Sequence, residues 1–155
     1  MAKSVHPPSS ARAEHRPALR AMIEEHGLVL LYDAVCGLCN GFVRFVLRHD
    51  QQGTMRFATL QGAWGMEAAR VVPNMARADS IVLLSRDGAL IRSTAALEVA
   101  RYLGGVWTAA LIGYLVPRAW RDTIYDWVAR HRYRWFGTLD ACPLPSPETR
   151  ARFLD

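Results

Sequence analysis

Short apolar runs recur along the chain, and their lengths predict four strands. Residues 28–32 (LVLLY) form a continuous apolar run, the pattern of a central strand that is buried on both faces. Residues 55–60, 80–85 and 89–92 have the length and composition of three further strands. The pair Asp87-Gly88 between the last two runs is a hairpin signal, so the third and fourth strands should be antiparallel.

Segments of helical periodicity separate these strands. In residues 42–48 the side chains of Phe42, Phe45 and Val46 share one face, while arginines occupy the other. This helix lies between the first two strands, and a strand, a helix and a strand at this spacing predict a parallel βαβ unit. Residues 61–79 are expected to be helical in part.

A further helix is predicted after the hairpin, with Ser93 or Thr94 as its N-terminal cap and Leu103 as its last residue. The resulting order, β-α-β-α-β-β-α, is the element order of the thioredoxin fold. The sequence therefore predicts an α/β protein with a thioredoxin-like, four-stranded mixed sheet flanked by helices.

The C-terminal third predicts a helical extension of this core. Residues 106–116 are almost wholly apolar but too short to span a bilayer, so we expect them to add to the core around the sheet. Residues 118–136 read as an amphipathic helix with its arginines in solvent. Its expected buried face comprises Trp120, Ile124, Trp127, Val128, His131 and Trp135.

Length and charge add limits to this picture. The chain has 155 residues and fits one domain, with a flexible arm and short helix at 1–26, the core at 27–105 and the extension at 106–155. A net charge of +5 permits anionic partners. Residues 130–135 (RHRYRW) interleave basic and aromatic side chains, but the helical period favours packing, so no nucleic-acid partner is expected. Contact of 106–116 with a membrane surface is the lesser alternative.

The placement of two of the three cysteines points to redox chemistry. Cys36 and Cys39 follow the first strand and open the first helix, where unpaired N–H groups favour a thiolate over a thiol. We expect Cys36 to be the exposed nucleophile and Cys39 to resolve the mixed disulfide. Asp33, three residues earlier, is expected to accept a proton from Cys39 or to cap the helix.

The expected reaction needs no cofactor, but it needs a protein or low-molecular-weight disulfide as substrate and an external thiol reductant. Residues 1–27 contain no apolar signal segment, so the expected location is the reducing cytoplasm. Further residues are expected to support the dithiol or face the substrate. They are Tyr32, Gly37, Leu38, Asp79, Ser80 and Ser93.

Two other readings remain open. Cys142 is either a third redox cysteine or a residue that packs the tail. A zinc module would combine Cys142 with Cys36 and Cys39, although the five histidines show no paired spacing and no metal is expected. A non-catalytic protein that binds a partner or a membrane surface is the other alternative.

The segment from Leu31 to Asn40 resembles the signature of the DCC family, thiol-disulfide oxidoreductases named for the motif DxxCxxC. This resemblance implies a thioredoxin-like fold with Cys36 and Cys39 as the redox pair. Ala34 stands where the family usually has glycine, and Asp79 or Ser80 stands where thioredoxins have a cis-proline. The resemblance covers about residues 28–154 and continues in Arg56-Phe57-Ala58, Asp79–Val82, Ser93–Leu97, Pro117, Arg121-Asp122, Tyr125, Arg132-Tyr133, Phe136-Gly137 and Cys142–Pro145.

Overall fold

A computed structural model describes residues 20–21, 23–72, 75, 80–139 and 146–154. The predicted N-terminal arm lies mainly outside these residues. Residues 23–26 are helical, as expected, and Ile23 is buried against the sheet.

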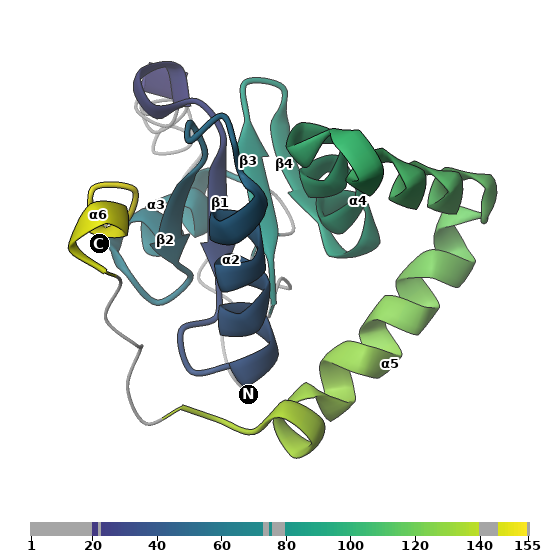
Figure 1. Ribbon diagram of the computed structural model, residues 1–155. Helices are drawn as coiled ribbons and strands as arrows, with labels where there is room; N and C mark the ends of the chain where they lie inside the picture. The colour runs from purple at the N-terminus through teal and green to yellow at the C-terminus, as the bar shows by residue number, and fades with distance from the viewer. Residues whose placement is uncertain (1–19, 22, 73–74, 76–79, 140–145, 155) are drawn as a thin grey trace.

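A four-stranded mixed sheet forms the centre of the molecule (Figure 1). Its order is β2-β1-β3-β4, with strands β1 (Val29–Tyr32), β2 (Arg56–Thr59), β3 (Val82–Ser85) and β4 (Gly88–Ile91). β1 pairs with β2 in parallel and with β3 antiparallel, and β4 is antiparallel to β3. The predicted α/β class and thioredoxin-like sheet are confirmed.

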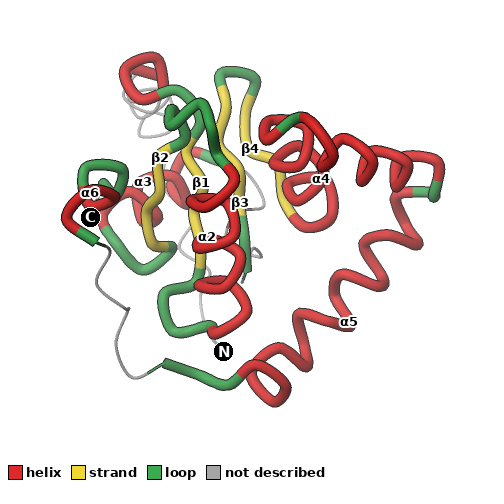
Figure 2. The backbone as a smooth tube through the Cα atoms, viewed as in Figure 1, coloured by secondary structure: helices red, strands yellow, loops and turns green. Residues whose placement is uncertain are grey.

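Helices cover both faces of this sheet (Figure 2). The helices α2 (Gly37–His49) and α4 (Arg92–Leu103) pack on one face, and α3 (Ala63–Val71) contributes to the other. Alternate residues of β1 supply both cores: Leu30 faces α2 and α4, while Leu31 faces the α3 side. This two-sided burial explains why the strand reads as an unbroken apolar run.

The start of α4 differs from the prediction. Arg92 adopts a left-handed φ of 57°, so the chain turns from β4 directly into the helix. Ser93 and Thr94 therefore lie inside the first turn, and no side chain caps the helix. The Ser93 hydroxyl instead donates to Asp122 of the next long helix, at 2.6 Å. The predicted capping role is wrong because the N-cap is Ile91, and Ser93 and Thr94 lie two and three positions beyond it.

The apolar segment after α4 does not add to the core. It forms a long 3-10 helix, η2 (Gly105–Leu115), which packs along α4 and contains no buried residue. Val106, Ile112 and Leu115 are each more than 70% exposed. Apolar composition predicted burial, but this narrow helix lies at the surface, where it contacts α4 and places Trp107 against Phe45 and His49 of α2. No helix in the described part of the chain has the length and apolar character to cross a membrane.

The long helix α5 (Arg118–Phe136) is rotated relative to the prediction. Trp120, Ile124 and Trp127 are exposed, and His131 stacks against Trp135 at the surface. The helix instead packs against α2 and α4, and the residues it buries fully are Ala129 and Arg132. The helical period of this segment was predicted correctly. The predicted buried face was wrong, because it was assigned to the side that carries the large aromatic residues.

The C-terminal segment closes the open edge of β2. After the short helix α6 (Pro147–Arg150), the N–H of Leu154 donates to the carbonyl of Phe57, and the N–H of Phe57 donates to the carbonyl of Arg152. Phe153 packs against Phe57 with ring centroids 5.4 Å apart. These contacts cover an edge that would otherwise offer unpaired backbone groups.

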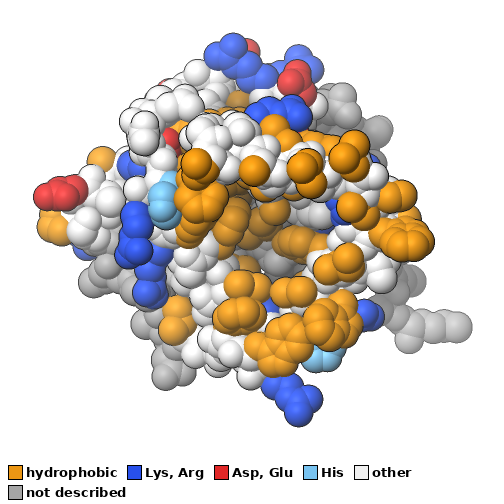
Figure 3. Space-filling view, turned by 45° about the vertical axis from the view of Figure 1, so that its right-hand side comes forward, with side chains coloured by type: hydrophobic (Ala, Val, Ile, Leu, Met, Phe, Trp, Pro, Cys, Tyr) orange, Lys and Arg blue, Asp and Glu red, His pale blue; other side chains and the backbone are white. Residues whose placement is uncertain are grey.

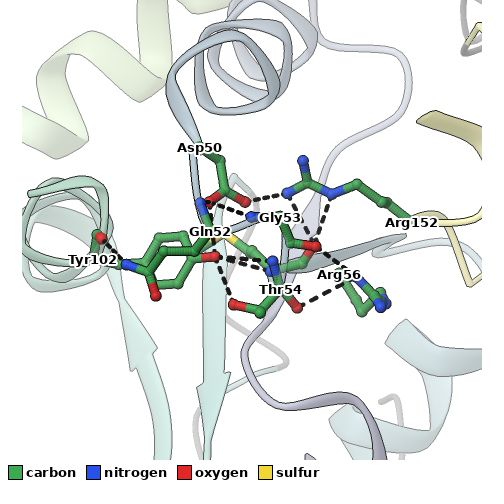
Figure 4. A network of polar contacts seen from close by, with 8 residues as sticks. Asp50, Gln52, Gly53, Thr54, Arg56, Tyr102 and Arg152 are labelled. Atoms are coloured by element: carbon green, nitrogen blue, oxygen red, sulfur yellow. Dashed lines mark hydrogen bonds and ion pairs between the residues drawn. The ribbon is translucent and has the colours of Figure 1, made fainter. Parts of the chain in front are cut away.

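A buried carboxylate at the end of α2 ties distant segments together (Figure 4). Asp50 Oδ1 accepts from the backbone N–H groups of Gln52 and Gly53 and from the Tyr102 hydroxyl of α4. Asp50 Oδ2 accepts from the Arg152 guanidinium, whose Nε also donates to the Met55 carbonyl. One side chain therefore joins the α2–β2 turn, α4 and the C-terminal segment.

We predict that Asp50→Ala lowers the free energy of unfolding by about 3 kcal/mol, because it leaves a largely buried guanidinium and a part-buried tyrosine hydroxyl without this acceptor. Urea denaturation of the purified variant measures this loss. The control is Arg70→Ala, which breaks an exposed ion pair with Glu67 and should cost less than about 1 kcal/mol. Equal losses in the two variants would contradict the anchoring role of Asp50.

Candidate functional site

The dithiol lies where β1 meets α2, as predicted. Cys36 is the N-cap of α2, with φ −83° and ψ 118°, and its Sγ accepts the N–H of Cys39 at 3.3 Å. The N–H of Asn40 in turn donates to the Cys36 carbonyl. Both cysteines are free thiols in this structure. The Cys36 sulfur at this N-cap lies at the positive end of the helix dipole and accepts an amide N–H.

A short segment, residues 137–139, crosses over the dithiol and is called the strap below. The N–H of Leu139 donates to the Val35 carbonyl at 2.8 Å, and the N–H of Gly37 donates to the Gly137 carbonyl at 3.2 Å. Between these bonds Thr138 pairs antiparallel with Cys36. The strap thus continues α5 across the N-terminus of α2, as Figure 1 shows.

Gly37 is required by the close approach of this chain. A Cβ at position 37 would lie 2.2 Å from the Phe136 carbonyl oxygen, a distance at which backbone atoms would have to move. Gly37 was predicted to support the dithiol, and it does so by leaving room for the end of α5.

The predicted exposure of Cys36 is wrong. Cys36 has 0% of its surface exposed, whereas Cys39 retains 3%. The backbone of the strap pairs with Cys36, while Cys39 borders a pocket between α2, α4 and α5. A nucleophile at position 36 therefore depends on movement of the strap.

Asn40 holds the loop that carries Cys36. Its side-chain amide donates to the carbonyls of Ala34 at 2.7 Å and Cys36 at 2.9 Å, and the residue is buried. Two backbone acceptors of the loop are thereby satisfied from one turn of the helix. Asn40 had no predicted role, although its position directly after Cys39 places it next to the dithiol.

Asp33 is a buried junction of polar contacts. Its Oδ1 accepts from the Gln61 side chain at 2.8 Å and from the N–H of Val35 at 3.2 Å. Its Oδ2 accepts from the Tyr133 hydroxyl and lies 3.5 Å from Arg132 Nη2. The bond to Val35 forms a local turn, so Asp33 supports the loop before α2. The predicted capping role of Asp33 is wrong, because the N-cap of α2 is Cys36.

Arg132 is the main residue that sequence reasoning placed incorrectly. It was expected in solvent, but it is 3% exposed, and its Nη1 donates to the Ala129 carbonyl. Its Nη2 donates to the Tyr133 hydroxyl at 2.8 Å, so Arg132, Tyr133 and Asp33 form one closed group. A buried charge is tolerated only when it is paired, and Asp33 supplies the opposite charge.

The surroundings of Cys39 disfavour its thiolate. Burial is the largest cause that raises the pKa of Cys39, followed by the hydrogen bond and the charge of Cys36. The backbone N–H of Asp33 and the positive charge of Arg132 lower the pKa of Cys39 in opposition, but they do not offset the burial. Cys39 is therefore held as a thiol beside Cys36.

The remaining predicted residues fall in different places. Tyr32 is buried in β1, Leu38 lines the pocket, and the hydroxyls of Ser80 and Tyr125 lie 2.5 Å apart on its wall. Asp79 and Cys142 lie outside the described residues, so their roles stay predictions. Among the described residues, His, Cys, Asp and Glu side chains do not gather in groups of three or more that could hold a metal ion.

Comparisons with known proteins agree with this site. Residues 30–138 match the DCC1-like thiol-disulfide oxidoreductase family. The chain belongs to this family. An uncharacterised protein of Bacillus subtilis, YuxK, is 40% identical over 128 residues, which cover 81% of this chain and 93% of that protein.

A plant relative extends the comparison. The DCC family protein At1g52590 of Arabidopsis thaliana, named as chloroplastic, is 34% identical over 126 residues, covering 78% of this chain and 72% of that protein. No solved structure shows a significant match. The region shared with the DCC1-like family ends at Thr138, so it includes the dithiol, Arg132 and the residue of the strap that pairs with Cys36.

We predict that Leu139→Pro accelerates alkylation of Cys36 by about fivefold, because proline removes one backbone hydrogen bond of the strap. Reduced protein is pulsed with iodoacetamide, and the peptide containing Cys36 is quantified by mass spectrometry. Leu139→Ala, which keeps the N–H, is the matched control and should react like the wild type. Equal rates in the proline and alanine variants would show that the strap does not limit access.

We also predict that the reduced protein loses stability with rising pH because of Cys39. The folded state keeps the Cys39 proton, whereas the unfolded thiol releases it above its ordinary pKa of about 8.5. The folded state then binds more protons, so stability falls by about 1.4 kcal/mol per pH unit above that value. Urea unfolding at pH 8 to 10 should show this slope in the wild type and a smaller one in Cys39→Ser. Parallel slopes would contradict the raised pKa.

Proposed function

We propose that this protein catalyses dithiol–disulfide exchange, with Cys36 as the nucleophile and Cys39 as the resolving thiol. Membership of the DCC1-like thiol-disulfide oxidoreductase family supports a redox role. The observation that carries the assignment of the two sulfurs is the N-cap geometry. Cys36 Sγ accepts an amide N–H at the start of α2, while burial beside Cys36 raises the pKa of Cys39.

The proposed reaction proceeds in two exchanges. The Cys36 thiolate attacks one sulfur of the substrate disulfide, so that the substrate S–S bond breaks and its other sulfur leaves as a thiolate that takes up a proton. Cys39 then loses its proton and attacks Cys36 Sγ. The mixed disulfide breaks, the second substrate sulfur leaves as a thiolate, and a Cys36–Cys39 disulfide forms. The strap moves aside during the first exchange because it covers Cys36.

Asp33 and Arg132 act as positioning residues in this proposal. Asp33 directs its backbone N–H to Cys39, and the Arg132 charge lowers the pKa of Cys39, so both favour the thiolate that the second exchange requires. Both carboxylate oxygens of Asp33 are already engaged by Gln61, Val35, Tyr133 and Arg132. We therefore assign Asp33 to support of the dithiol and not to proton transfer.

The oxidised dithiol must be reduced again by an external thiol system, which supplies two electrons and two protons per cycle. No prosthetic group takes part in the proposed reaction. A reductive direction fits a reducing compartment such as the cytoplasm, the location expected from the sequence.

The test is a redox titration of purified, metal-analysed protein in thiol–disulfide buffers, with both cysteines followed by differential alkylation and mass spectrometry. We predict one reversible two-electron transition that links Cys36 to Cys39, with a potential of about −120 to −270 mV, as in other oxidoreductases. Cys39→Ser should accumulate a mixed disulfide on Cys36, whereas Cys36→Ser should form none on Cys39 at comparable rate.

Each contrary result has a distinct meaning. Mixed disulfides that accumulate on Cys39 in Cys36→Ser would reverse the roles of the two sulfurs. Cysteines that never pair would refute the exchange reaction and favour a binding role. Stoichiometric zinc that blocks alkylation would favour the metal-binding alternative, in which Cys142 is the expected third ligand.

A further inference from the structure

An apolar pocket borders the dithiol at Cys39. It has a volume of about 150 Å³ and is lined by residues of α2, α4 and α5, together with Ser80 and Ile81. Cys39 and Leu38 form its α2 wall, and Ala96 and Val128 face them from α4 and α5. A cavity of this size holds an apolar group as large as benzene. It therefore accommodates one leucine or phenylalanine side chain next to Cys39.

A second, more open cavity of about 360 Å³ continues this pocket along the cleft between α4 and α5. The two cavities share Ala96, Tyr125 and Val128, so they form one groove that leads from the surface to Cys39. In Figure 3 hydrophobic side chains gather around a hollow on this side of the molecule. We call the two cavities together the α4–α5 groove.

The polar groups of the α4–α5 groove are largely engaged within the protein. Ser80 and Tyr125 pair with each other, Ser93 donates to Asp122, and Arg132 is held by Asp33 and Tyr133. These contacts leave the groove walls apolar and without an exposed acidic side chain. A strongly charged small disulfide such as glutathione disulfide gains little from the walls of the inner pocket, because its carboxylates would lose hydration there and the one cation, Arg132, is already paired with Asp33.

One guanidinium nitrogen at the outer end of the groove, Arg121 Nη1, lacks a hydrogen-bond acceptor among the described residues. Arg121 Nε donates to the Val116 carbonyl, but the buried Arg121 Nη1 has no hydrogen-bond partner among the described residues. A buried guanidinium nitrogen without an acceptor costs free energy, which a ligand oxygen at this point would recover. This observation is independent of the pocket at Cys39.

The length of the groove indicates the kind of ligand. Arg121 and Arg132 mark its two ends on α5, and eleven residues of helix correspond to about 16 Å. An extended polypeptide of about five residues spans the same distance. A single apolar group would fill only the inner pocket, whereas a peptide places successive side chains along the whole groove and carbonyl oxygens within reach of Arg121.

We propose that the α4–α5 groove binds an extended, apolar polypeptide segment next to the cystine of a substrate protein, with an apolar side chain in the pocket at Cys39 and a backbone carbonyl on Arg121. This assignment rests on the proposed function and adds its substrate class. The exchange chemistry is unchanged: the bound segment brings its disulfide to the dithiol at the inner end of the groove, where the strap is displaced from Cys36.

The experiment compares three disulfides as oxidants of the full-length reduced protein. Two are synthetic peptide disulfides that differ only in leucine or serine on both sides of the cysteine, and the third is glutathione disulfide. Stopped reactions are quantified by alkylation and mass spectrometry of Cys36 and Cys39. We expect the leucine peptide to react about tenfold faster than the serine peptide, the factor that burial of one large apolar side chain supplies.

Two variants test the groove itself. Ala96→Leu fills the region shared by both cavities without loss of helix propensity, and it should remove the preference for the leucine peptide over the serine peptide. Ala110→Leu, the same substitution at an exposed position of η2, is the matched control and should keep the preference. Arg121→Met removes the donor but keeps an apolar stem, and should slow both peptides by about tenfold relative to glutathione disulfide.

The outcomes separate this assignment from the proposed function. Equal rates for the two peptides in the wild type would overturn the assignment and leave the oxidoreductase intact. The assignment would also be overturned if a variant at Ala96 or Arg121 lowered the reaction rate with glutathione disulfide as much as the rates with the peptides. Such a result would mean that the substitution disturbs the fold and not the binding of peptide. A wild-type protein that reacts with none of the three disulfides would overturn the proposed function and the assignment with it.

Discussion

The buried ion pair between Asp33 and Arg132 joins the last long helix to the loop that carries the dithiol. Its two side chains are almost wholly removed from water, so neither charge is tolerable without the other. The Tyr133 hydroxyl and the Gln61 amide complete the carboxylate shell of Asp33. Because Arg132 comes from α5, the pair fixes this helix against α2, and the position of α5 then determines the strap, the pocket and the groove.

The same helix determines the access to both cysteine sulfurs, because its C-terminal continuation covers Cys36 and its inner face borders the pocket at Cys39. Its C-terminal continuation lies across Cys36, and a glycine at position 37 is what permits the chain to pass so close. Its inner face, at Val128 and Arg132, leaves space beside Cys39. In this DCC1-like protein the extension supplies the strap that pairs with Cys36, so it belongs to the site as much as the sheet does.

The exposed aromatic residues of α5 follow from this arrangement. The helix faces α2 and α4 with Tyr125, Ala129 and Arg132, and the tryptophans lie on its outer side, where they are exposed. At the other end of the helix, Ser93 and Arg92 of α4 hold Asp122 and Asp126. These contacts keep α4 and α5 at the separation that leaves the groove open between them.

The sequence by itself determined the sheet, the βαβ unit and the place of the cysteine pair, because strand-length apolar runs, helical periods and a CxxC motif after a strand are local signals. It also identified Asp33 as a neighbour of the dithiol, since Asp33 stands three positions before Cys36. Only the tertiary structure decided that Cys36 is covered, that Arg132 is buried and that the tryptophans of α5 face outward. These features depend on which side of α5 faces α2. The contacts of Asp33 with Arg132 and Tyr133 determine that side. Asp33 and Tyr133 are one hundred residues apart in the sequence, so a local sequence pattern does not predict their contact.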